Sequence, residues 1–154
     1  MDNAQIHHAL KMFDTASTSA HEAAWALLRP LGVGVVPFLA EYFPRTKKAQ
    51  GRAALIFHAI RFARESQAAF DLGLLALNDK ATLVRYRACG LCAYSFRKDA
   101  IPHLERLLGH ADVKTADDAR AAIDAIRRKN HHYFVDRSHS NSTFWEVNSE
   151  DVRS

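Results

Sequence analysis

The sequence predicts an all-α protein, an α-solenoid of about three to four helical hairpins with a small extended or β-hairpin segment at the C-terminal end. Two observations favour this fold. Over residues 80–112 the apolar residues recur at steps of three and four, which is the pattern of amphipathic helices that each bury one face. Other residues recur at an interval of 33, a period typical of repeated helical hairpins.

Residues 80–112 form the clearest unit of this kind. The first helix carries its apolar stripe at Leu83, Val84, Ala88, Leu91 and Cys92, and the second carries its own at Ile101, Leu104, Leu107 and Leu108. A polar turn at residues 97–99 joins them, Pro102 lies near the start of the second helix, and Gly109 ends it. A single hairpin cannot bury both helices, so we expect copies of the unit above and below it.

The 33-residue interval separates like residues in neighbouring units. It relates Lys47 to Lys80, Arg52 to Arg85, Arg64 to Arg97, Asp79 to Asp112, and the pair Leu74 and Leu75 to Leu107 and Leu108. The pattern of Asp79, Val84, Arg85, Ala88 and Leu91, followed by Ala100, Leu104, Leu107 and Leu108, resembles the HEAT consensus and is similar to the HEAT and armadillo class of repeats. The resemblance covers about residues 15–130 and implies a stacked helical scaffold that docks a partner.

Composition and length predict one repeat domain with a short appendage. The chain has 154 residues, of which 48% are apolar, enough for one core. We expect a HEAT-like domain over residues 1–130, an aromatic hairpin or cap packed on the stack over residues 131–148, and a frayed tail over residues 149–154. No apolar run reaches 18 residues and the first residues lack a charged-then-apolar leader, so we expect a cytoplasmic protein.

The N-terminal third predicts three helices. Residues 2–14 have helical spacing and would cover the open end of the stack. Ser19 and Glu22 fit a capping box for a helix that runs to about residue 28. Proline and glycine then interrupt the chain, and a further helix over residues 35–43 ends before Pro44.

The remaining helices follow the same pattern. A helix within residues 45–64 is expected to bury Leu55, Ile56 and Phe57, and second helices over residues 67–77 and 99–109 would line the inner curve of the stack. A last helix over residues 116–129 begins with acids and ends with bases, which suits the helix dipole.

Basic residues are concentrated in two of the repeats. Residues 45–64 and 80–98 contain no acid, and the net charge of residues 1–129 is +6, against −2 for residues 130–154. Stacking would bring the period-related bases together as a stripe for an acidic partner. The candidate partner-binding residues are Lys47, Arg52, Arg64, Lys80, Arg85, Arg87 and Arg97 on the stripe, His103 and Arg106 on a second helix, and Tyr133 and Trp145 in the tail. The alternative is that these arginines are solvated or pair with acids such as Asp79 and Asp112 across the turns.

The cysteines and histidines predict no metal, cofactor or catalytic centre. Cys89 and Cys92 form a C-x-x-C pair inside a helix, where we expect small core residues, because no second pair completes a zinc site. In the tail, His131, His132, Asp136 and His139 invite a metal hypothesis. Adjacent residues of a strand point to opposite sides, however, and no supporting helix motif is present.

These observations predict a non-catalytic protein-binding module rather than an enzyme, because no phosphate loop, nucleophile elbow or supported acid pair is found. In size and layout the chain also resembles immunity proteins, which bind and neutralise a toxin domain delivered between competing cells. The alternative is a nucleic-acid-binding helical-repeat protein that uses the basic stripe, consistent with a sequence pI near 9.3.

Overall fold

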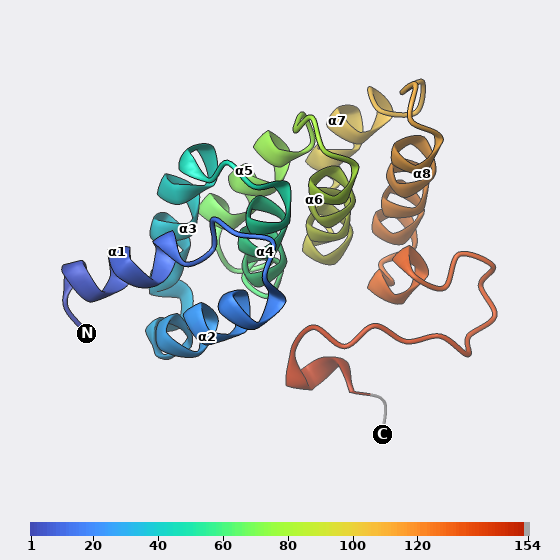
Figure 1. Cartoon of the computed structure of the whole chain (residues 1–154). Helices are drawn as coiled ribbons and strands as arrows, with labels where there is room; N and C mark the ends of the chain where they lie inside the picture. The colour runs from blue at the N-terminus through green and yellow to red at the C-terminus, as the bar shows by residue number, and fades with distance from the viewer. Residues whose placement is uncertain (153–154) are drawn as a thin grey trace.

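The computed structural model describes residues 1–152, and all regular secondary structure in that range is helical (Figure 1). The α-helices are α1 (Asn3–Lys11), α2 (Thr18–Leu28), α3 (Val36–Tyr42), α4 (Ala49–Ile60), α5 (Gln67–Ala76), α6 (Thr82–Ser95), α7 (Ile101–Glu105) and α8 (Val113–Arg128). The 3-10 helices are η1 (Arg29–Val35), η2 (Phe43–Arg45), η3 (Lys98–Ala100), η4 (His131–Phe134) and η5 (Ser149–Asp151). The predicted all-α fold class is therefore confirmed.

The three longest helices, α4, α6 and α8, lie side by side in chain order (Figure 1). Helix α5 packs against both α4 and α6, and α7 packs against α8. Leu55, Leu91 and Ile126 come from the three long helices and are fully buried in one continuous core. Each such side chain contributes roughly 1.5–3 kcal/mol by leaving water, so burial of these faces holds the array together.

Polar side chains fix where the helices begin. Ser17 caps α2, so the capping box expected at Ser19 and Glu22 does not form, because Ser19 already lies inside the helix. Helix α8 begins at Val113, three residues before the expected start, because the Asp112 carboxylate accepts a hydrogen bond from the first turn.

The helical run over residues 18–45 is long and apolar enough, by length and composition alone, to cross a membrane. It is not one straight helix, because Gly32 takes a φ of 57°, in the left-handed region that favours glycine. Leu28, Val36 and Leu39 from this run are buried in the core with the other helices.

Cys89 and Cys92 are free and completely buried on α6. Burial raises the pKa of the Cys92 thiol to about 12, so this side chain is a neutral thiol at physiological pH. Their position agrees with the prediction that both are small core residues.

The C-terminal segment differs from the expected β-hairpin. Residues 131–134 form the 3-10 helix η4, which packs on α8 and α6, and no strand forms in the described part of the tail. The chain then passes beneath α6 and returns toward α4 (Figure 1). Residues 149–151 form η5, with the Asp151 side chain only 4% exposed, so this part of the expected frayed tail is packed. Residues 153–154 lie outside the described residues.

Candidate protein-interaction surface

Arg52 does not belong to an exposed basic stripe. Its side chain is 9% exposed, and its Nε and Nη2 donate to the two carboxylate oxygens of Asp79 at 2.8 and 3.1 Å. Its Nη1 donates to the carbonyl of Lys47 at 2.6 Å. Burial raises the pKa of Asp79, but the hydrogen bonds from Arg52 and the backbone N–H of Ala81 bring it below its usual value. Arg52 therefore joins two interhelical turns and cannot contact a partner.

Arg85 is buried in the same way one interval later. Its Nη2 lies 2.9 Å from Asp112 Oδ2, its Nε donates to the Thr115 hydroxyl at 2.8 Å, and its Nη1 donates to the carbonyl of Asp79 at 2.8 Å. The hydroxyls of Thr82 and Thr115, together with Arg85, lower the pKa of Asp112 to about 2. Arg52 and Arg85 thus form the ion pairs with Asp79 and Asp112 that the alternative predicted, and burial of both guanidinium groups argues against a role for them in partner binding.

Lys47 and Lys80 remain exposed at the starts of α4 and α6. The backbone N–H of Lys47 donates to Asp14 Oδ1 at 3.0 Å, and neither ammonium group forms an ion pair within residues 1–152. Arg52 donates to the Lys47 carbonyl, whereas Arg64 and Arg97 follow the C-terminal ends of α4 and α6.

Arg64 and Arg97 lie on aromatic rings. The Arg64 guanidinium lies 3.8 Å from the ring centroid of Tyr94 and 4.0 Å from that of Phe96, and the Arg97 guanidinium lies 3.8 Å from that of Phe70. Arg64 Nε also donates to the carbonyl of Tyr94 at 2.6 Å. These stacked positions are stabilised within the chain.

His103 lies half-buried on α7, and Arg106 is exposed at the C-terminal end of that helix. Neither residue lines a hollow together with the other predicted residues.

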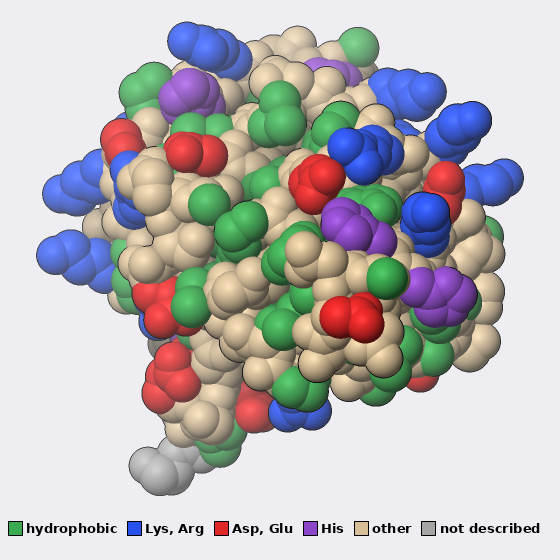
Figure 2. Space-filling model, turned by 90° about the vertical axis from the view of Figure 1, so that its left-hand side faces the viewer, with side chains coloured by type: hydrophobic (Ala, Val, Ile, Leu, Met, Phe, Trp, Pro, Cys, Tyr) green, Lys and Arg blue, Asp and Glu red, His purple; other side chains and the backbone are tan. Residues whose placement is uncertain are grey.

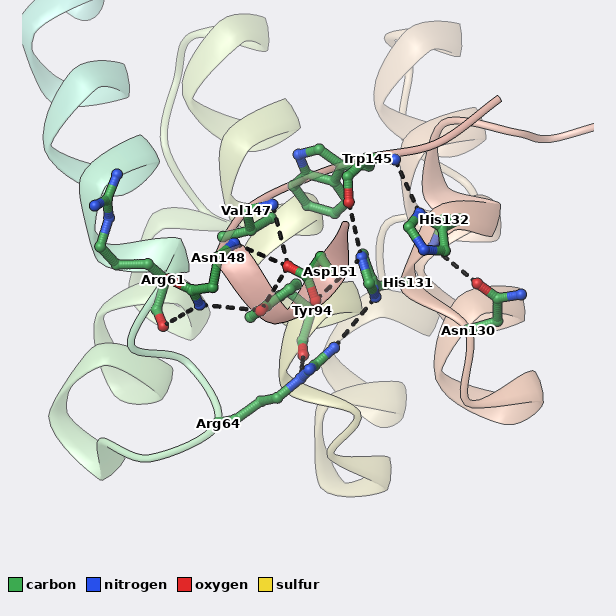
Figure 3. A network of polar contacts seen from close by, with 10 residues as sticks. All are labelled: Arg61, Arg64, Tyr94, Asn130, His131, His132, Trp145, Val147, Asn148 and Asp151. Carbon is green, nitrogen blue, oxygen red and sulfur yellow. Dashed lines mark hydrogen bonds and ion pairs between the residues drawn. The ribbon is translucent and has the colours of Figure 1, made fainter. Parts of the chain in front are cut away.

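Trp145 belongs to a polar network that fastens the tail to the helices (Figure 3). His131 Nε2 donates to the carbonyl of Trp145 at 2.8 Å, and the N–H of Trp145 donates to His132 Nδ1 at 2.8 Å. Arg64 Nη2 donates to the other ring nitrogen of His131 at 3.2 Å. Burial is the main cause that lowers the pKa of His131, so the neutral ring both donates and accepts.

Asp151 is the centre of the same network (Figure 3). One of its oxygens, Oδ2, accepts hydrogen bonds from the Tyr94 hydroxyl at 2.8 Å and from the N–H groups of Val147 and Asn148 at 3.1 and 2.9 Å. The Asn148 amide donates to the carbonyl of Arg61, 87 residues away, at 3.0 Å. Burial raises the pKa of Tyr94 to about 12, so its hydroxyl stays protonated as a donor. This network holds the tail across α6 and against the turn after α4.

A continuous series of shallow hollows runs along one face of α4, α6 and α8. The first hollow lies between α2, α4 and α6, the second between α6 and α8, and the third between α8 and the tail, with volumes of about 290, 570 and 480 Å³. Leu83 lines the first and second hollows, and Asp117 and Arg137 line the second and third. We call this surface the α4–α6–α8 face.

The α4–α6–α8 face exposes large apolar side chains. Phe57 is 42% exposed and Leu83 is 41% exposed, although both were expected to be buried. In each case the adjacent residue, Ile56 or Val84, is fully buried instead. The sequence pattern did not distinguish Phe57 from the buried Leu55 and Ile56, because all three are apolar.

Two of the candidate partner-binding residues, Arg87 and Tyr133, lie on this face. The Arg87 guanidinium lies 4.8 Å from the ring centroid of Phe57, and the Tyr133 ring stacks on His139 at 4.0 Å beside the third hollow. His139 also contacts Asp124 on α8 at 2.5 Å. The face therefore combines aromatic, aliphatic and arginine side chains, a composition enriched in protein interfaces.

The end of the molecule at which α1 lies carries charged side chains of both signs. Figure 2 shows Lys and Arg side chains mainly around the edges of this face, with acidic, histidine and hydrophobic side chains mixed between them. No single basic patch is visible from this side.

The histidines and the aspartate of the tail that suggested a metal site are not arranged as one. Asp136 accepts hydrogen bonds from the Ser140 hydroxyl and from the backbone of Ser140 and Asn141, so it closes a local turn. Within residues 1–152 no group of three or more His, Cys, Asp or Glu side chains is placed to hold a metal ion.

Comparison of the chain with protein-family models, with curated proteins and with solved structures gave no significant match.

Proposed function

We propose that this protein is a non-catalytic protein-binding module that docks its partner on the α4–α6–α8 face. The observation that carries the proposal is the exposure of Phe57 and Leu83 in one hollow, which Arg87 also lines with its guanidinium over the Phe57 ring. Apolar side chains exposed in concave sites, next to an arginine already held on an aromatic ring, supply anchors at low entropic cost.

We further propose a HEAT-like α-solenoid as the scaffold of this face. The side-by-side order of α4, α6 and α8 supports it, as does the recurrence of an arginine paired with an aspartate 27 residues later in two successive units. In such an array each unit contacts mainly its neighbours, so a flat or curved surface several helices wide is presented to a partner.

The class of partner that we propose is a toxin domain, with this chain as the cognate immunity protein. Support comes from the resemblance in size and layout, and from a surface rich in anchor residues. To test it, tagged protein is used to capture partners from the source cell, and the captured polypeptide is expressed in a host cell with and without this chain. Recovery of a polypeptide that is toxic only in the absence of this chain is the expected result.

A matched pair of variants tests the surface itself. Leu83→Asp places a charge on the α4–α6–α8 face, and Leu75→Asp places one on α5, where Leu75 is 57% exposed and lines none of the three hollows. Leu83→Asp should weaken capture at least tenfold, while Leu75→Asp should leave it unchanged. Equal effects of the two variants would exclude this face as the docking site.

Nucleic-acid binding is the alternative, and the ion pairs of Arg52 and Arg85 count against it because they neutralise the central positions of the expected stripe. A binding assay with DNA and RNA at 50 and 200 mM salt separates the two functions, since phosphate contacts give a steep salt dependence. We expect no binding at the higher salt concentration.

A further inference from the structure

The first hollow of the α4–α6–α8 face contains an unsatisfied polar side chain. Ala54, Phe57 and Leu83 supply apolar walls, and His58 and Arg87 also line the hollow. His58 is 9% exposed, its Nδ1 is buried without a hydrogen-bond partner, and neither ring nitrogen bonds to another part of the described chain. Buried polar groups in folded proteins nearly always have a partner, so the unpartnered Nδ1 beside this hollow is an exception.

The imidazole of His58 is held in place from behind. The ring of Trp25 stacks on it with a centroid distance of 4.1 Å and an interplanar angle of 9°, and the Phe13 ring meets it at 6.0 Å. Burial, and then the neighbouring Arg61, His21 and Arg87, lower the pKa of His58 to about 3. The ring is therefore neutral at physiological pH and has both a hydrogen-bond donor and an acceptor.

Positive charge around this hollow is not balanced within the chain. The charges of Arg61 and Arg87 lower the pKa of His58, and the charge of Arg29 lowers the pKa of Arg61. None of the three arginines forms an ion pair within residues 1–152. Among the ten other arginines in that range, Arg64, Arg106 and Arg127 also form no ion pair, and seven pair with carboxylates: Arg45, Arg52, Arg85, Arg97, Arg120, Arg128 and Arg137. The one acidic side chain that lines the hollow is Glu22.

The two nearest arginines are oriented by aromatic rings. The guanidinium of Arg61 lies 5.1 Å from the ring centroid of Trp25, and that of Arg87 lies 4.8 Å from that of Phe57. Arg61 Nε is, with His58 Nδ1, one of two buried side-chain nitrogens without a partner in the described chain. A guanidinium that lies over a ring keeps its N–H edge free for a planar anion, and a carboxylate matches that edge.

We propose that this hollow is an anchor pocket for an acidic segment of the partner protein, an inference that rests on the protein-binding function proposed above. An apolar side chain of the partner packs between Phe57 and Leu83, and a neighbouring carboxylate pairs with Arg87 in the positive potential of Arg61 and Arg29. The volume of about 290 Å³ suits one or two side chains. The apolar walls and Glu22 make the site a poor match for a phosphate backbone.

The two tryptophans of the chain provide built-in reporters for this proposal. Trp25 backs His58, whereas Trp145 lies in the tail near Gly90 and Phe134. In ¹⁵N-labelled full-length protein, the two indole N–H signals are assigned with a Trp145→Phe variant. The probe is a six-residue peptide of alternating acidic and apolar residues, and the control peptide has Asn and Gln in place of Asp and Glu.

The acidic peptide should shift the Trp25 indole signal and leave that of Trp145 unchanged, and the neutral peptide should bind at least fivefold more weakly. Arg87→Gln should weaken binding roughly fivefold to tenfold, the ordinary effect of losing one charge-assisted contact. Arg106→Gln, at an exposed position on the end of α7, is the matched control and should have no effect.

Three results would overturn the inference: no shift of the Trp25 signal at millimolar peptide, equal affinity for the two peptides, or a stronger Trp25 shift with a short oligonucleotide. The proposed function is judged separately. If a captured partner is lost with Leu83→Asp but retained with Arg87→Gln, the face binds protein and the acidic anchor is wrong.

Discussion

Arg52 Nε lies 2.8 Å from Asp79 Oδ2, and both side chains are 9% exposed. The same carboxylate accepts the backbone N–H of Ala81 at 2.9 Å, just before α6 begins. Asp79 therefore couples the first turn of α4 to the turn that starts α6. Arg85 and Asp112 repeat this arrangement between α6 and α8. The two ion pairs fix the relative positions of the three long helices at one end.

Arg52→Ala should destabilise the protein by about 3 kcal/mol, because it leaves Asp79 as a buried charge without its partner. The free energy of unfolding, measured in urea, checks this value. Arg128→Ala is the control: its pair with Asp124 lies on the surface of one helix, with 58% of the arginine side chain exposed, and should contribute less than about 0.5 kcal/mol. Equal losses for the two variants would show that burial of the Arg52 pair has no special effect.

His58 should make the protein sensitive to mild acid. Its pKa in the folded protein is about 3, against an ordinary value of 6.5, so the unfolded chain binds a proton that the folded protein excludes. The contribution of the neutral His58 to the free energy of unfolding is fully present above pH 6.5. It falls as the pH drops toward 3, by up to about 1.4 kcal/mol for each pH unit. Burial lowers the pKa of His131 as well, so the wild-type protein loses stability from both residues.

The His58→Phe variant isolates the contribution of this ring. Phenylalanine keeps the stack on Trp25 but cannot be protonated. The free energy of unfolding of the variant, relative to that of the wild type, should therefore increase by roughly 1–2 kcal/mol between pH 8 and pH 5. Urea unfolding at the two pH values measures the difference. The exposed His8 serves as control, and His8→Gln should leave the pH dependence unchanged. Parallel pH profiles of the wild type and His58→Phe would contradict the prediction.

Asp151→Ala should release the tail without unfolding the helices. The substitution removes the acceptor for the Tyr94 hydroxyl and for two backbone N–H groups of the tail, which costs roughly 1–3 kcal/mol of local stability. Amide hydrogen exchange at Val147 and Asn148 should become faster, while exchange at Leu91 in α6 should change little. Glu150→Ala, at the exposed neighbouring position, is the control.

The helical fold follows from local patterns in the sequence, and the positions of the charged residues do not. Apolar spacing predicts the buried Leu91 and Leu104 correctly, because such spacing marks the helix face that packs on the core. The environment of Arg52 depends on the position of Asp79, 27 residues away, and thus on how the turns stack. The sequence supplied this ion pair only as one alternative.

The 3-10 helix at the start of the tail was missed for a similar reason. Its aromatic residues have high β-propensity, but the Asn130 side chain accepts the N–H of His132 at 3.0 Å and starts a 3-10 turn. Its remaining contacts are long-range: Asp151 binds Tyr94, and Asn148 binds the carbonyl of Arg61. Such contacts produce no periodic signal in the tail itself.

The first hollow was missed because Phe57 was assigned to the buried stripe.

At Gly51, α4 lies so close to the turn after α1 that there is no space for a side chain. A Cβ atom at this position would lie 2.0 Å from the carbonyl oxygen of Phe13 and 2.9 Å from Thr46 Cγ2. The Phe13 carbonyl is backbone and also accepts a hydrogen bond from His21 Nε2 at 3.1 Å, so it cannot move without breaking that contact. Gly51→Ala should therefore force α4 away from the turn that follows α1.

The expected loss for Gly51→Ala is at least about 2 kcal/mol, in spite of the higher helix propensity of alanine. Gly34→Ala is the matched control, since a Cβ there meets nothing within 4 Å and the backbone does not require glycine. That variant should be neutral or slightly more stable, because alanine restricts the unfolded chain. Urea unfolding of both variants measures the two effects. A Gly51→Ala protein as stable as Gly34→Ala would mean that α4 and the backbone at Phe13 are not packed at this distance.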